Sequence, residues 1–435
     1  LGPPMLRKRP NTPAPAAANT RLSTHEDTRM TTASSQSSQD AASLRAAMVD
    51  ELRGMGAITS GAVAAAMASV PRHLFVPEEP LEAAYAANSA LVVKRDARGS
   101  ATSSLSAAHI QAVMLEQAGI EPGMRVLEVG SGGYNAALLA ELVGDEGKVV
   151  SVDIDPDIVE RARTCLKAAG YGRVEVVEAD AEHGVPDGAP YDRIIVTAGA
   201  WDIPPAWIEQ LSRNGRIVVP LRMRGLTRSI AFDRVDGVLI SRSYRLSGFV
   251  PMQGAGAHDE QLVHLEEGVA LRVDDQSLKF DADELRAALR TSRLERWSNA
   301  PFDLPDELEL FLMTSATQMA LLHVSEELAG QGRFAPSATR GVPALISGGG
   351  IAYRTKRPNE KTGGFESGVI AHGPEADTVA EQYLELLRRW AHEHGRRGAA
   401  LIRYRPTALD ASTSTKGAAE GLIVKRHGVI EVSWS

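Results

Sequence analysis

The stretch from Val126 to Asn135 combines the residue types and spacing that most clearly indicate chemistry. It reads as a short apolar strand that runs into Gly130, Gly132 and Gly133 and then directly into a helix. Glycines at such a turn allow the backbone to approach a ligand closely, and the start of the helix presents unpaired N–H groups. The pattern therefore predicts a loop that binds a small cofactor.

Two details of this loop decide which cofactor it favours. A dinucleotide fingerprint would need its third glycine where the sequence has Asn135. Glu128 stands two residues before Gly130 and produces the E-x-G-x-G form expected around S-adenosylmethionine. We therefore expect S-adenosylmethionine as the cofactor, converted to S-adenosylhomocysteine, with Glu128, Gly130, Ser131 and Gly132 in its binding site.

Two carboxylates follow the next two strands of the pattern. Asp153 lies 20 positions after Gly133 at the end of a strand, where a carboxylate can accept hydrogen bonds from both ribose hydroxyls. Asp180 follows the third strand, where it could accept from the adenine amino group. Aspartates in such positions also cap helices. We assign that role to Asp155 and ribose binding to Asp153.

Helices and apolar strands alternate from residue 106 to about residue 250, and these elements must position the residues above. Such alternation predicts a parallel sheet covered on both faces, with the ligand beyond the carboxyl ends of its strands. The expected fold class is α/β, a Rossmann-like doubly wound sheet over residues 106–250. Its predicted helices are 108–117, 136–142, 156–169 and 204–211, and its predicted strands are 125–129, 148–152, 173–177, 192–197 and 216–219.

The flanking segments predict three further parts of the chain. Residues 1–42 are rich in Ser, Thr, Pro and Ala without apolar periodicity, which predicts a disordered tail. Residues 43–105 predict two helices and then a polar surface loop at 94–104. Residues 251–435 predict a separate α+β accessory domain for peptide recognition or dimerisation. Its expected helices are 282–291, 319–328 and 376–394, and its expected strands are 368–371, 399–404 and 422–433.

The composition excludes several classes of function. The chain has 435 residues, a net charge of −8 and a single cysteine, Cys165. This charge argues against a broad contact with nucleic acid, and no apolar run approaches the ~20 residues that cross a bilayer. One cysteine cannot form an internal disulfide, and the histidines lack metal-ligand spacing. We therefore expect a cytoplasmic monomer or homodimer that binds no metal, nucleic acid or membrane.

Six short motifs between residues 70 and 251 are specific when they are taken together. They are V-P-R-H-L-F-V-P at 70–77, S-A-A-H at 106–109, Y-N-A-A at 134–137, A-P-Y-D at 189–192, I-I-V-T-A at 194–198 and F-V-P at 249–251. In this order they resemble the protein-L-isoaspartate O-methyltransferase family over about residues 45–253. The resemblance implies the fold of a class I methyltransferase that depends on S-adenosylmethionine.

Three features depart from the usual pattern of that family. The glycine loop is one residue shorter at 132–134, the segment 94–99 replaces a shorter apolar one, and about 180 residues follow the end of the match. These features are similar to a branch associated with ribosomally made peptides such as lanthipeptides, lasso peptides and graspetides. The resemblance thus implies methylation of an aspartate in a modified precursor peptide, leading to a succinimide and isoaspartate. The alternatives are general isoaspartyl repair with an extra domain, and a silent peptide-binding module.

The implied reaction is attack of a carboxylate oxygen on the methyl group of a sulfonium. Carboxylates are ionised at neutral pH, so the main requirement is alignment. We expect Ser106 to hold the carboxylate and also to cap the following helix, and His109 to orient Ser106, contact the substrate or simply pack. Further residues expected around the cofactor are Ser103, Ile154, Ala181 and Thr197, and those expected around the substrate are Lys94, Arg95 and Ser104.

Overall fold

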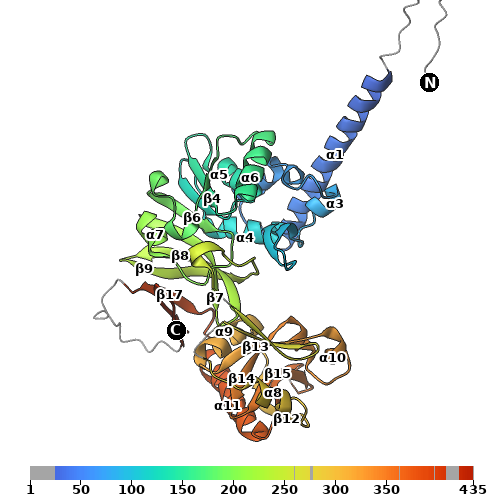
Figure 1. The fold of residues 1–435 in the computed structure, drawn as a ribbon, viewed down its shortest axis with the longest axis vertical. Helices are drawn as coiled ribbons and strands as arrows, with labels where there is room; N and C mark the ends of the chain where they lie inside the picture. Colours follow the sequence, from blue (N-terminus) through green and yellow to red (C-terminus); the bar gives the residue numbers. More distant parts are fainter. Residues whose placement is uncertain are drawn as a thin grey trace, which may run out of the picture.

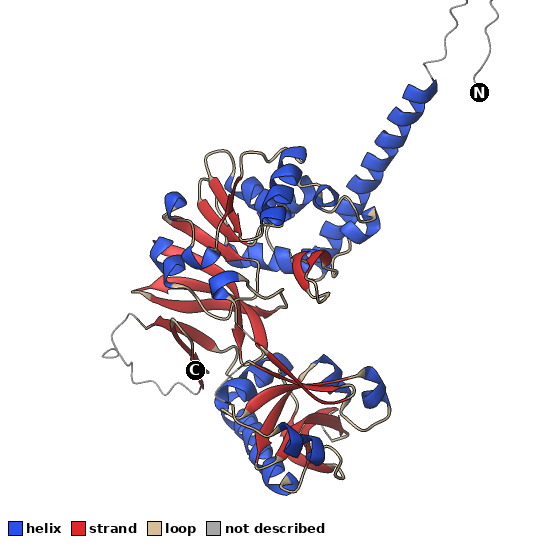
Figure 2. Cartoon of the chain, in the orientation of Figure 1, coloured by secondary structure: helices blue, strands red, loops and turns tan. Residues whose placement is uncertain are grey.

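The computed structural model describes residues 25–434, except for residues 259, 275–277, 362, 396 and 408–420. Figures 1 and 2 show two bodies, each built around a β-sheet, with a long helix that projects from the first body. The first body holds a ten-stranded sheet and the second a seven-stranded sheet. None of the described helices is long and apolar enough to cross a membrane.

The projecting helix, α1, begins within the segment that was expected to be a disordered tail. Residues 25–42 are helical, so that expectation is wrong for them, whereas residues 1–24 lie outside the described residues. Ala41, Met48 and Leu52 of α1 are buried, and this packing stabilises a helix that continues toward the N-terminus. The helical elements before the central sheet are α1 (His25–Gly54), α2 (Gly61–Ser69), the 3₁₀ helix η1 (Arg72–Phe75) and α3 (Leu81–Ala84).

The segment 94–104, expected to be a loop, belongs to an antiparallel hairpin. Its strands are β1 (Leu91–Arg95) and β2 (Ala101–Leu105). Asp96 closes the turn because its Oδ1 accepts hydrogen bonds from the backbone N–H groups of Arg98 and Ser100 at 2.9 and 2.8 Å. The Asp96 side chain thus provides hydrogen-bond acceptors for the backbone N–H groups of the turn. A polar sequence can therefore form two paired strands here.

The central sheet confirms the expected doubly wound α/β fold. Its strand order is β18-β19-β17-β9-β8-β7-β6-β3-β4-β5, and β5, β4, β3, β6 and the first part of β7 are parallel. The chain moves to one side of β3 through β4 and β5, and to the other side through β6 and β7. The order therefore reverses at the end of β3, directly before the glycine loop.

These are the bounds of the elements from α4 to β9. The helices are α4 (Ala108–Ala118), α5 (Tyr134–Val143), α6 (Pro156–Ala168) and α7 (Pro205–Gln210), with short 3₁₀ helices η2 (Ala181–His183) and η3 (Pro186–Gly188). The strands are β3 (Arg125–Val129), β4 (Lys148–Asp153), β5 (Glu175–Glu178), β6 (Tyr191–Val196), β7 (Leu211–Met223), β8 (Leu226–Val235) and β9 (Val238–Leu246).

Successive residues of the central strands enter two different hydrophobic clusters. Val126 packs in the cluster that contains α4, α5 and α6, whereas the next residue, Leu127, packs in the cluster that contains Trp207 of α7. Side chains of a strand alternate between the two faces of a sheet. Both faces are therefore covered, as the continuous apolar strands predicted.

The second body surrounds the seven-stranded sheet of order β10-β11-β13-β14-β15-β16-β12. The expected helix 319–328 is wrong, because its first six residues form β13 and only a short helix follows. An apolar run of this length fits a helix or a buried strand, and here it pairs with β11 and β14 on its two sides. The strands are β10 (Gln261–Glu266), β11 (Val269–Val273), β12 (Leu294–Pro301), β13 (Met319–Val324), β14 (Val342–Ser347), β15 (Gly350–Asn359) and β16 (Gly364–His372). The helices are α8 (Ala282–Ala288), α9 (Pro305–Ser315), α10 (Glu326–Gly330), α11 (Ala376–Arg389), the 3₁₀ helix η5 (Pro336–Arg340) and the π-helix η6 (Trp390–His394). The 3₁₀ helix η4 (Gly254–Gly256) precedes them and lies against the first body, where Asp180 accepts from the N–H of Ala255.

The C-terminal strands return to the first body, which corrects the expected domain boundary. These strands are β17 (Leu401–Pro406), β18 (Gly421–Val424) and β19 (Gly428–Ser433). β17 pairs with β9 of the central sheet and with β19. Residues 251–435 are therefore not one separate domain, since only the part between β9 and β17 builds the second body.

Candidate functional site

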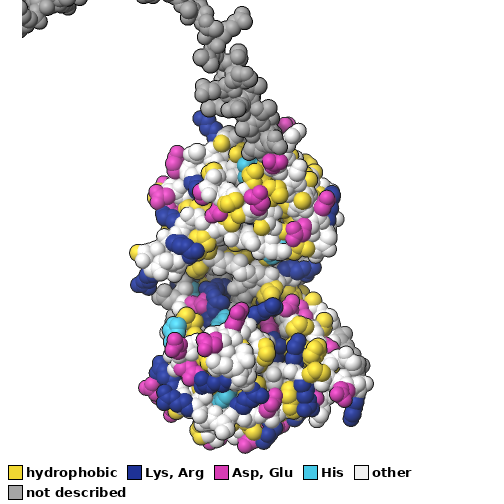
Figure 3. All heavy atoms as spheres, turned by 90° about the vertical axis from the view of Figure 1, so that its right-hand side faces the viewer, with side chains coloured by type: hydrophobic (Ala, Val, Ile, Leu, Met, Phe, Trp, Pro, Cys, Tyr) yellow, Lys and Arg dark blue, Asp and Glu magenta, His cyan; other side chains and the backbone are white. Residues whose placement is uncertain are grey.

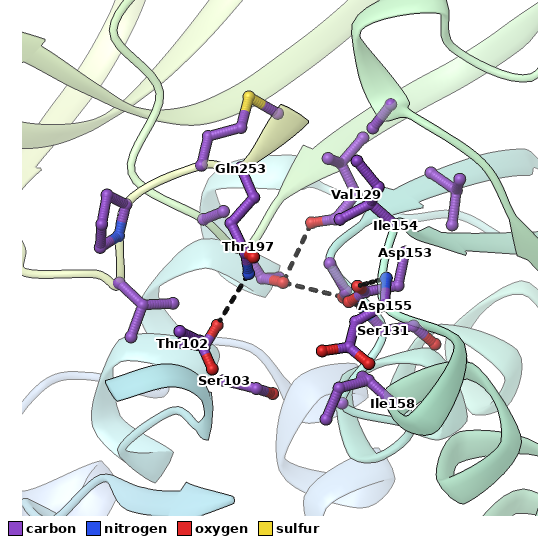
Figure 4. A pocket seen from close by; sticks show the side chains of 18 of the residues that line it. Thr102, Ser103, Val129, Ser131, Asp153, Ile154, Asp155, Ile158, Thr197 and Gln253 are labelled. Atoms are coloured by element: carbon purple, nitrogen blue, oxygen red, sulfur yellow. Dashed lines mark hydrogen bonds between the residues drawn. The ribbon is translucent and has the colours of Figure 1, made fainter. Parts of the chain in front are cut away.

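A cavity opens where the parallel strands of the central sheet end, at the edge that the doubly wound pattern predicts for a ligand. Figure 4 shows its side chains converging from the ends of several strands and from the segment that follows β9. Of the ten residues predicted to bind the cofactor, nine line this cavity. They are Ser103, Gly130, Ser131, Gly132, Asp153, Ile154, Asp180, Ala181 and Thr197.

The glycine loop has a backbone that other residues could not adopt without strain. Gly130 has a φ of 96°, and a Cβ atom there would lie 2.5 Å from Thr197 Oγ1. Thr197 Oγ1 lies 3.0 Å from the carbonyl oxygen of Val129 and 2.9 Å from that of Gly130. Gly133 has a φ of 79°, and its Cβ atom would meet the ring of Phe75 at 3.0 Å. The two glycines thus allow the loop to pass between β6 and the N-terminal helices.

Asp153 holds the loop and the start of α6 together at the wall of the cavity. Its Oδ2 accepts from the N–H of Ser131 at 2.9 Å, and its Oδ1 accepts from the N–H of Asp155 at 3.0 Å. Burial raises the pKa of Asp153, and these two bonds oppose that rise. A carboxylate has further lone pairs, so Asp153 can still accept from a ligand. Asp155 caps α6 as expected, because its side chain accepts from the N–H of Asp157.

Glu128 does not line the cavity, in contrast to the prediction from the E-x-G-x-G pattern. Its side chain is fully buried, where Oε1 accepts from Asn135 Nδ2 at 2.9 Å and Oε2 lies 2.5 Å from Ser151 Oγ. Ser151 Oγ also lies 2.9 Å from Ser131 Oγ. Burial raises the pKa of Glu128 to about 7. As a strand residue it faces the interior, so it supports the loop from below through Asn135, Ser151 and Ser131.

The segment after β9 forms the opposite wall of the cavity. Val250, Pro251, Met252 and Gln253 line it, and Gln253 Nε2 donates to the carbonyl of Thr102 on β2 at 3.3 Å. Asp180 Oδ2 accepts from the N–H of Ala255 at 2.8 Å, so this carboxylate also anchors the segment. The F-V-P motif at 249–251 signals this wall in the sequence, whereas nothing in the sequence singles out Thr102 or Gln253.

A second cavity of about 740 Å³ adjoins the first and contains the residues expected to act on the substrate. Ser104, Ser106 and His109 line it, and Ser104, Val250 and Pro251 line both cavities. Ala107, and not Ser106, is the N-cap of α4, and no side chain bonds to that helix end. The expected capping role of Ser106 is therefore wrong, and its hydroxyl stays available to the cavity.

His109 is held by a backbone carbonyl in this second cavity. Its Nδ1 lies 3.1 Å from the carbonyl oxygen of Ala87, so that nitrogen is the donor of this hydrogen bond. No bond joins His109 to Ser106 in the described part of the chain. Of the roles considered for His109, contact with a substrate therefore fits its position better than orienting Ser106.

Arg72, inside the motif at 70–77, positions the turn that carries Ser106. The guanidinium is fully buried and donates to the carbonyls of Ala84 and Ser106 at 2.7 Å each, and to Gln111 Oε1 at 2.6 Å. It also lies over the ring of Tyr134, 4.8 Å from the centroid. One side chain thus links the prolyl turn, the glycine loop and the start of α4.

Lys94 and Arg95 line neither cavity, in contrast to their predicted role with the substrate, although Lys94 contacts Asp155 at the edge of the first cavity. Lys94 Nζ forms ion pairs with Asp155 and Asp157 at the start of α6, at 2.6 and 2.7 Å. Hydrogen bonds to these two aspartates raise the pKa of Lys94. Arg95 donates to the carbonyl of Gly99 within its own hairpin at 2.9 Å. The charges expected to meet a peptide therefore fasten the hairpin.

The described residues contain no group of three or more side chains arranged to hold a metal ion. The first cavity has the features that an adenosyl cofactor needs, since a carboxylate, Asp153, stands at the end of the second parallel strand beside a tight glycine turn. Together, the doubly wound sheet and this cavity define a class I methyltransferase that depends on S-adenosylmethionine.

Comparison with known proteins identifies the family within this class. The family model "Protein-L-isoaspartate(D-aspartate) O-methyltransferase (PCMT)" matches residues 43–256. The enzyme of that name from Methanopyrus kandleri is 41% identical over 219 residues, which cover 50% of this chain and 94% of the relative. That from Methanococcoides burtonii is 41% identical over 208 residues, covering 48% and 98%. A solved protein-L-isoaspartate O-methyltransferase aligns with a TM-score of 0.47 at 23% identity, covering 82% of this chain and 96% of that one.

The chain belongs to the protein-L-isoaspartate O-methyltransferase family, whose members are carboxyl O-methyltransferases dependent on S-adenosylmethionine. The family model ends at residue 256, and the two relatives match the chain over about half its length.

Proposed function

We propose that this protein transfers the methyl group of S-adenosylmethionine to the carboxylate of isoaspartyl residues in peptides or proteins. The observation that carries the proposal is the junction of the two cavities at Ser104, with the adenosyl-type site on one side and Ser106 and His109 on the other. The family match supports isoaspartate as the acceptor.

The residues of the second cavity need only hold and orient the acceptor. When bound, the cofactor supplies an electrophilic methyl group on a sulfonium. The acceptor carboxylate is already ionised at neutral pH, so no side chain has to remove a proton. Ser106 can donate its hydroxyl proton to one carboxylate oxygen and leave the other free to react. Alignment of this kind can contribute ~7–11 kcal/mol to lowering a barrier.

The methyl ester then reacts without further help from the enzyme. The backbone nitrogen that follows the esterified residue attacks the ester carbonyl, a C–N bond forms, and methanol leaves with the amide proton. The resulting succinimide takes up water and opens to aspartate or isoaspartate. Repeated cycles convert isoaspartate to aspartate.

The test uses two peptides of identical sequence that differ only in one aspartyl or isoaspartyl linkage. With S-adenosylmethionine, we expect mass spectrometry to detect the methyl ester and then the succinimide from the isoaspartyl peptide alone. The variant Ser106→Ala should lower kcat with little change in S-adenosylhomocysteine affinity, because Ser106 does not line the first cavity. A protein that modifies neither peptide would contradict the proposal.

A second candidate is a methyltransferase dedicated to an ordinary aspartate of one modified, ribosomally made peptide. The large part of the chain that follows the family match favours it, since about 180 residues extend beyond residue 256. The same experiment separates the two candidates when it includes the precursor peptide encoded beside the gene. Modification of that peptide, and of no unrelated isoaspartyl peptide, would establish the second candidate.

A further inference from the structure

A third hollow, of about 730 Å³, lies between the two bodies of the molecule. This volume is within the range of ligand-binding sites. β7 and β8 of the central sheet provide one wall, and the other includes residues of β11, β13 and β15. Figure 3 shows this side of the molecule, where Lys and Arg side chains gather with some acidic ones around the constriction between the bodies. We call this hollow the interbody cleft.

The interbody cleft is cationic, although the whole chain carries a net charge of −8. Asp306 and Glu309 are the acidic residues among those that line it. The cationic ones are Arg222, Arg228, Arg272, Arg340, Arg354 and Lys356. The lining residues thus carry six positive and two negative charges, a balance that favours an anionic ligand there.

Half of these cations already have a carboxylate partner. Glu260 pairs with both Arg222 and Arg272, and Glu309 pairs with Arg354. The other three have no carboxylate within ion-pair distance in the part of the chain that the structure describes. They are Arg228, Arg340 and Lys356.

The three cations without a carboxylate partner differ in their surroundings. Arg228 is 1% exposed and, among the residues that the structure describes, donates to the backbone carbonyls of Thr227 and Asp306, each at 3.2 Å. Lys356 is exposed, 5.1 Å from the ring centroid of Phe302. Arg340 is also exposed. Buried and exposed positive charges thus occur along the same cleft.

Two polar atoms of residues that line the cleft have no hydrogen-bond partner among the described residues. These are His323 Nε2 and Arg354 Nε, both buried from solvent. Buried polar atoms in folded proteins are nearly always paired, so unpaired ones require an explanation. Because both atoms are closed off from solvent, a ligand in the cleft would reach them only after the lining residues moved, so the charge of the lining is the observation that favours a ligand.

The cleft adjoins the second cavity, which contains Ser106 and His109. The same segment, residues 246–249, lines both, so it forms a common edge. A chain whose reactive residue lies in the second cavity would cross this edge into the cleft. A surface groove that shares no edge with the second cavity would not offer the acceptor chain this path.

We propose that the interbody cleft binds the part of the acceptor polypeptide that flanks the methylated residue, and that it favours acidic flanking sequences. This inference rests on the proposed function, since it takes the acceptor to be a polypeptide. The unpaired Arg340 and Lys356 lie at exposed positions where they can meet glutamate or aspartate side chains.

The test compares two labelled isoaspartyl peptides that differ only in their flanks, which are glutamate-rich in one and glutamine-rich in the other. Fluorescence anisotropy measures binding to the full-length protein, and methylation of both is followed in parallel. We expect the wild type to bind the glutamate-rich peptide about fivefold more tightly, with the preference falling as salt is raised.

The double variant Arg340→Ala/Lys356→Ala removes two exposed charges from the cleft. We expect it to weaken binding of the glutamate-rich peptide about fivefold, raise its KM similarly and leave kcat unchanged. The matched control Arg213→Ala/Arg290→Ala removes two exposed charges that do not line the cleft, and should change nothing. The glutamine-rich peptide should bind both variants like the wild type.

Equal affinity of the wild type for the two peptides would overturn the inference, and so would a preference that survives in the cleft variant or falls equally in the control. These results are distinct from failure of the proposed function. If neither peptide is methylated but the preference is present and lost in the cleft variant, the cleft assignment stands while the methylation of isoaspartate fails. If both are methylated without a preference, only the cleft assignment fails.

Discussion

Replacing Glu128 by glutamine should stabilise this protein at alkaline pH, which reverses the usual effect of altering a buried residue. The side chain is fully buried, and burial raises its pKa from 4.5 to about 7. The folded state therefore binds the proton more tightly than the unfolded state does. Stability is retained below pH 4.5, falls as pH rises toward 7, and then remains lower.

The size of the effect follows from these two pKa values. By linkage, ionisation of Glu128 costs about 0.8 kcal/mol of the free energy of unfolding at pH 5 and about 3.3 kcal/mol at pH 8. Glutamine cannot ionise, and its carbonyl can still accept from Ser151, while the amide of Asn135 can turn to present its oxygen. The gap between Glu128→Gln and the wild type should thus widen by about 2.5 kcal/mol in favour of the variant.

Urea unfolding of both proteins at pH 5 and pH 8, without ligand, measures this gap. Many groups titrate between these pH values, so only the difference between variant and wild type carries the argument. Glu146→Gln, at an exposed position, is the matched control and should follow the wild type at both pH values. A gap between Glu128→Gln and the wild type that is the same at pH 5 and pH 8 would refute the reasoning.

Three further predictions concern the site and its supports. Asp153→Asn should weaken S-adenosylhomocysteine binding by about tenfold or more in isothermal titration calorimetry, because hydrogen bonds to a charged acceptor contribute ~1.5–3 kcal/mol. Unchanged affinity would exclude Asp153 as the ribose acceptor. Arg72→Ala should lower the free energy of unfolding by about 3 kcal/mol, because three acceptors lose a buried charged donor, and Arg72→Lys should lower it by less. Equal stability of the wild type and both variants would contradict this. Arg426→Ala should weaken S-adenosylhomocysteine binding about two- to tenfold, because Arg426 donates to the carbonyl of Ala255 beside the cavity wall at 3.0 Å. The control is Arg403→Ala, on β17, and equal effects of the two variants on binding would count against this prediction.

The cofactor site was predictable because its signals are local in the sequence. A strand, a glycine turn and a helix start must be neighbours in the chain to form a loop of this kind, and a carboxylate at the end of the next parallel strand must lie beside it. Glu128 is the instructive exception. It belongs to the same pattern, but it precedes the end of β3, so its side chain enters the interior and supports the loop instead of lining the cavity.

Charged residues were harder to interpret because their partners come from other parts of the chain. Lys94 has the character of a residue that meets a substrate, yet Asp155 and Asp157, more than 60 residues away, hold it. Asp202 likewise accepts hydrogen bonds from distant residues, from Tyr404 Oη and from the N–H of His427, at 2.7 and 2.6 Å. Neither pairing leaves a periodic or compositional signal.

The return of the C-terminal strands to the central sheet was also not predictable, because their pairing partners are distant in the sequence. It shows that the second body is an insertion and not a C-terminal domain. β17 pairs with β9, and the turn after β18 reaches the cofactor cavity's wall through Arg426, so the second body is inserted between two neighbouring strands of the central sheet. A truncation after residue 250 would therefore remove three strands of the methyltransferase sheet, Tyr404 and His427 with them. Loss of cofactor binding in such a truncation would report the damaged sheet and reveal nothing about the interbody cleft, which is why point variants in the cleft are the informative experiment.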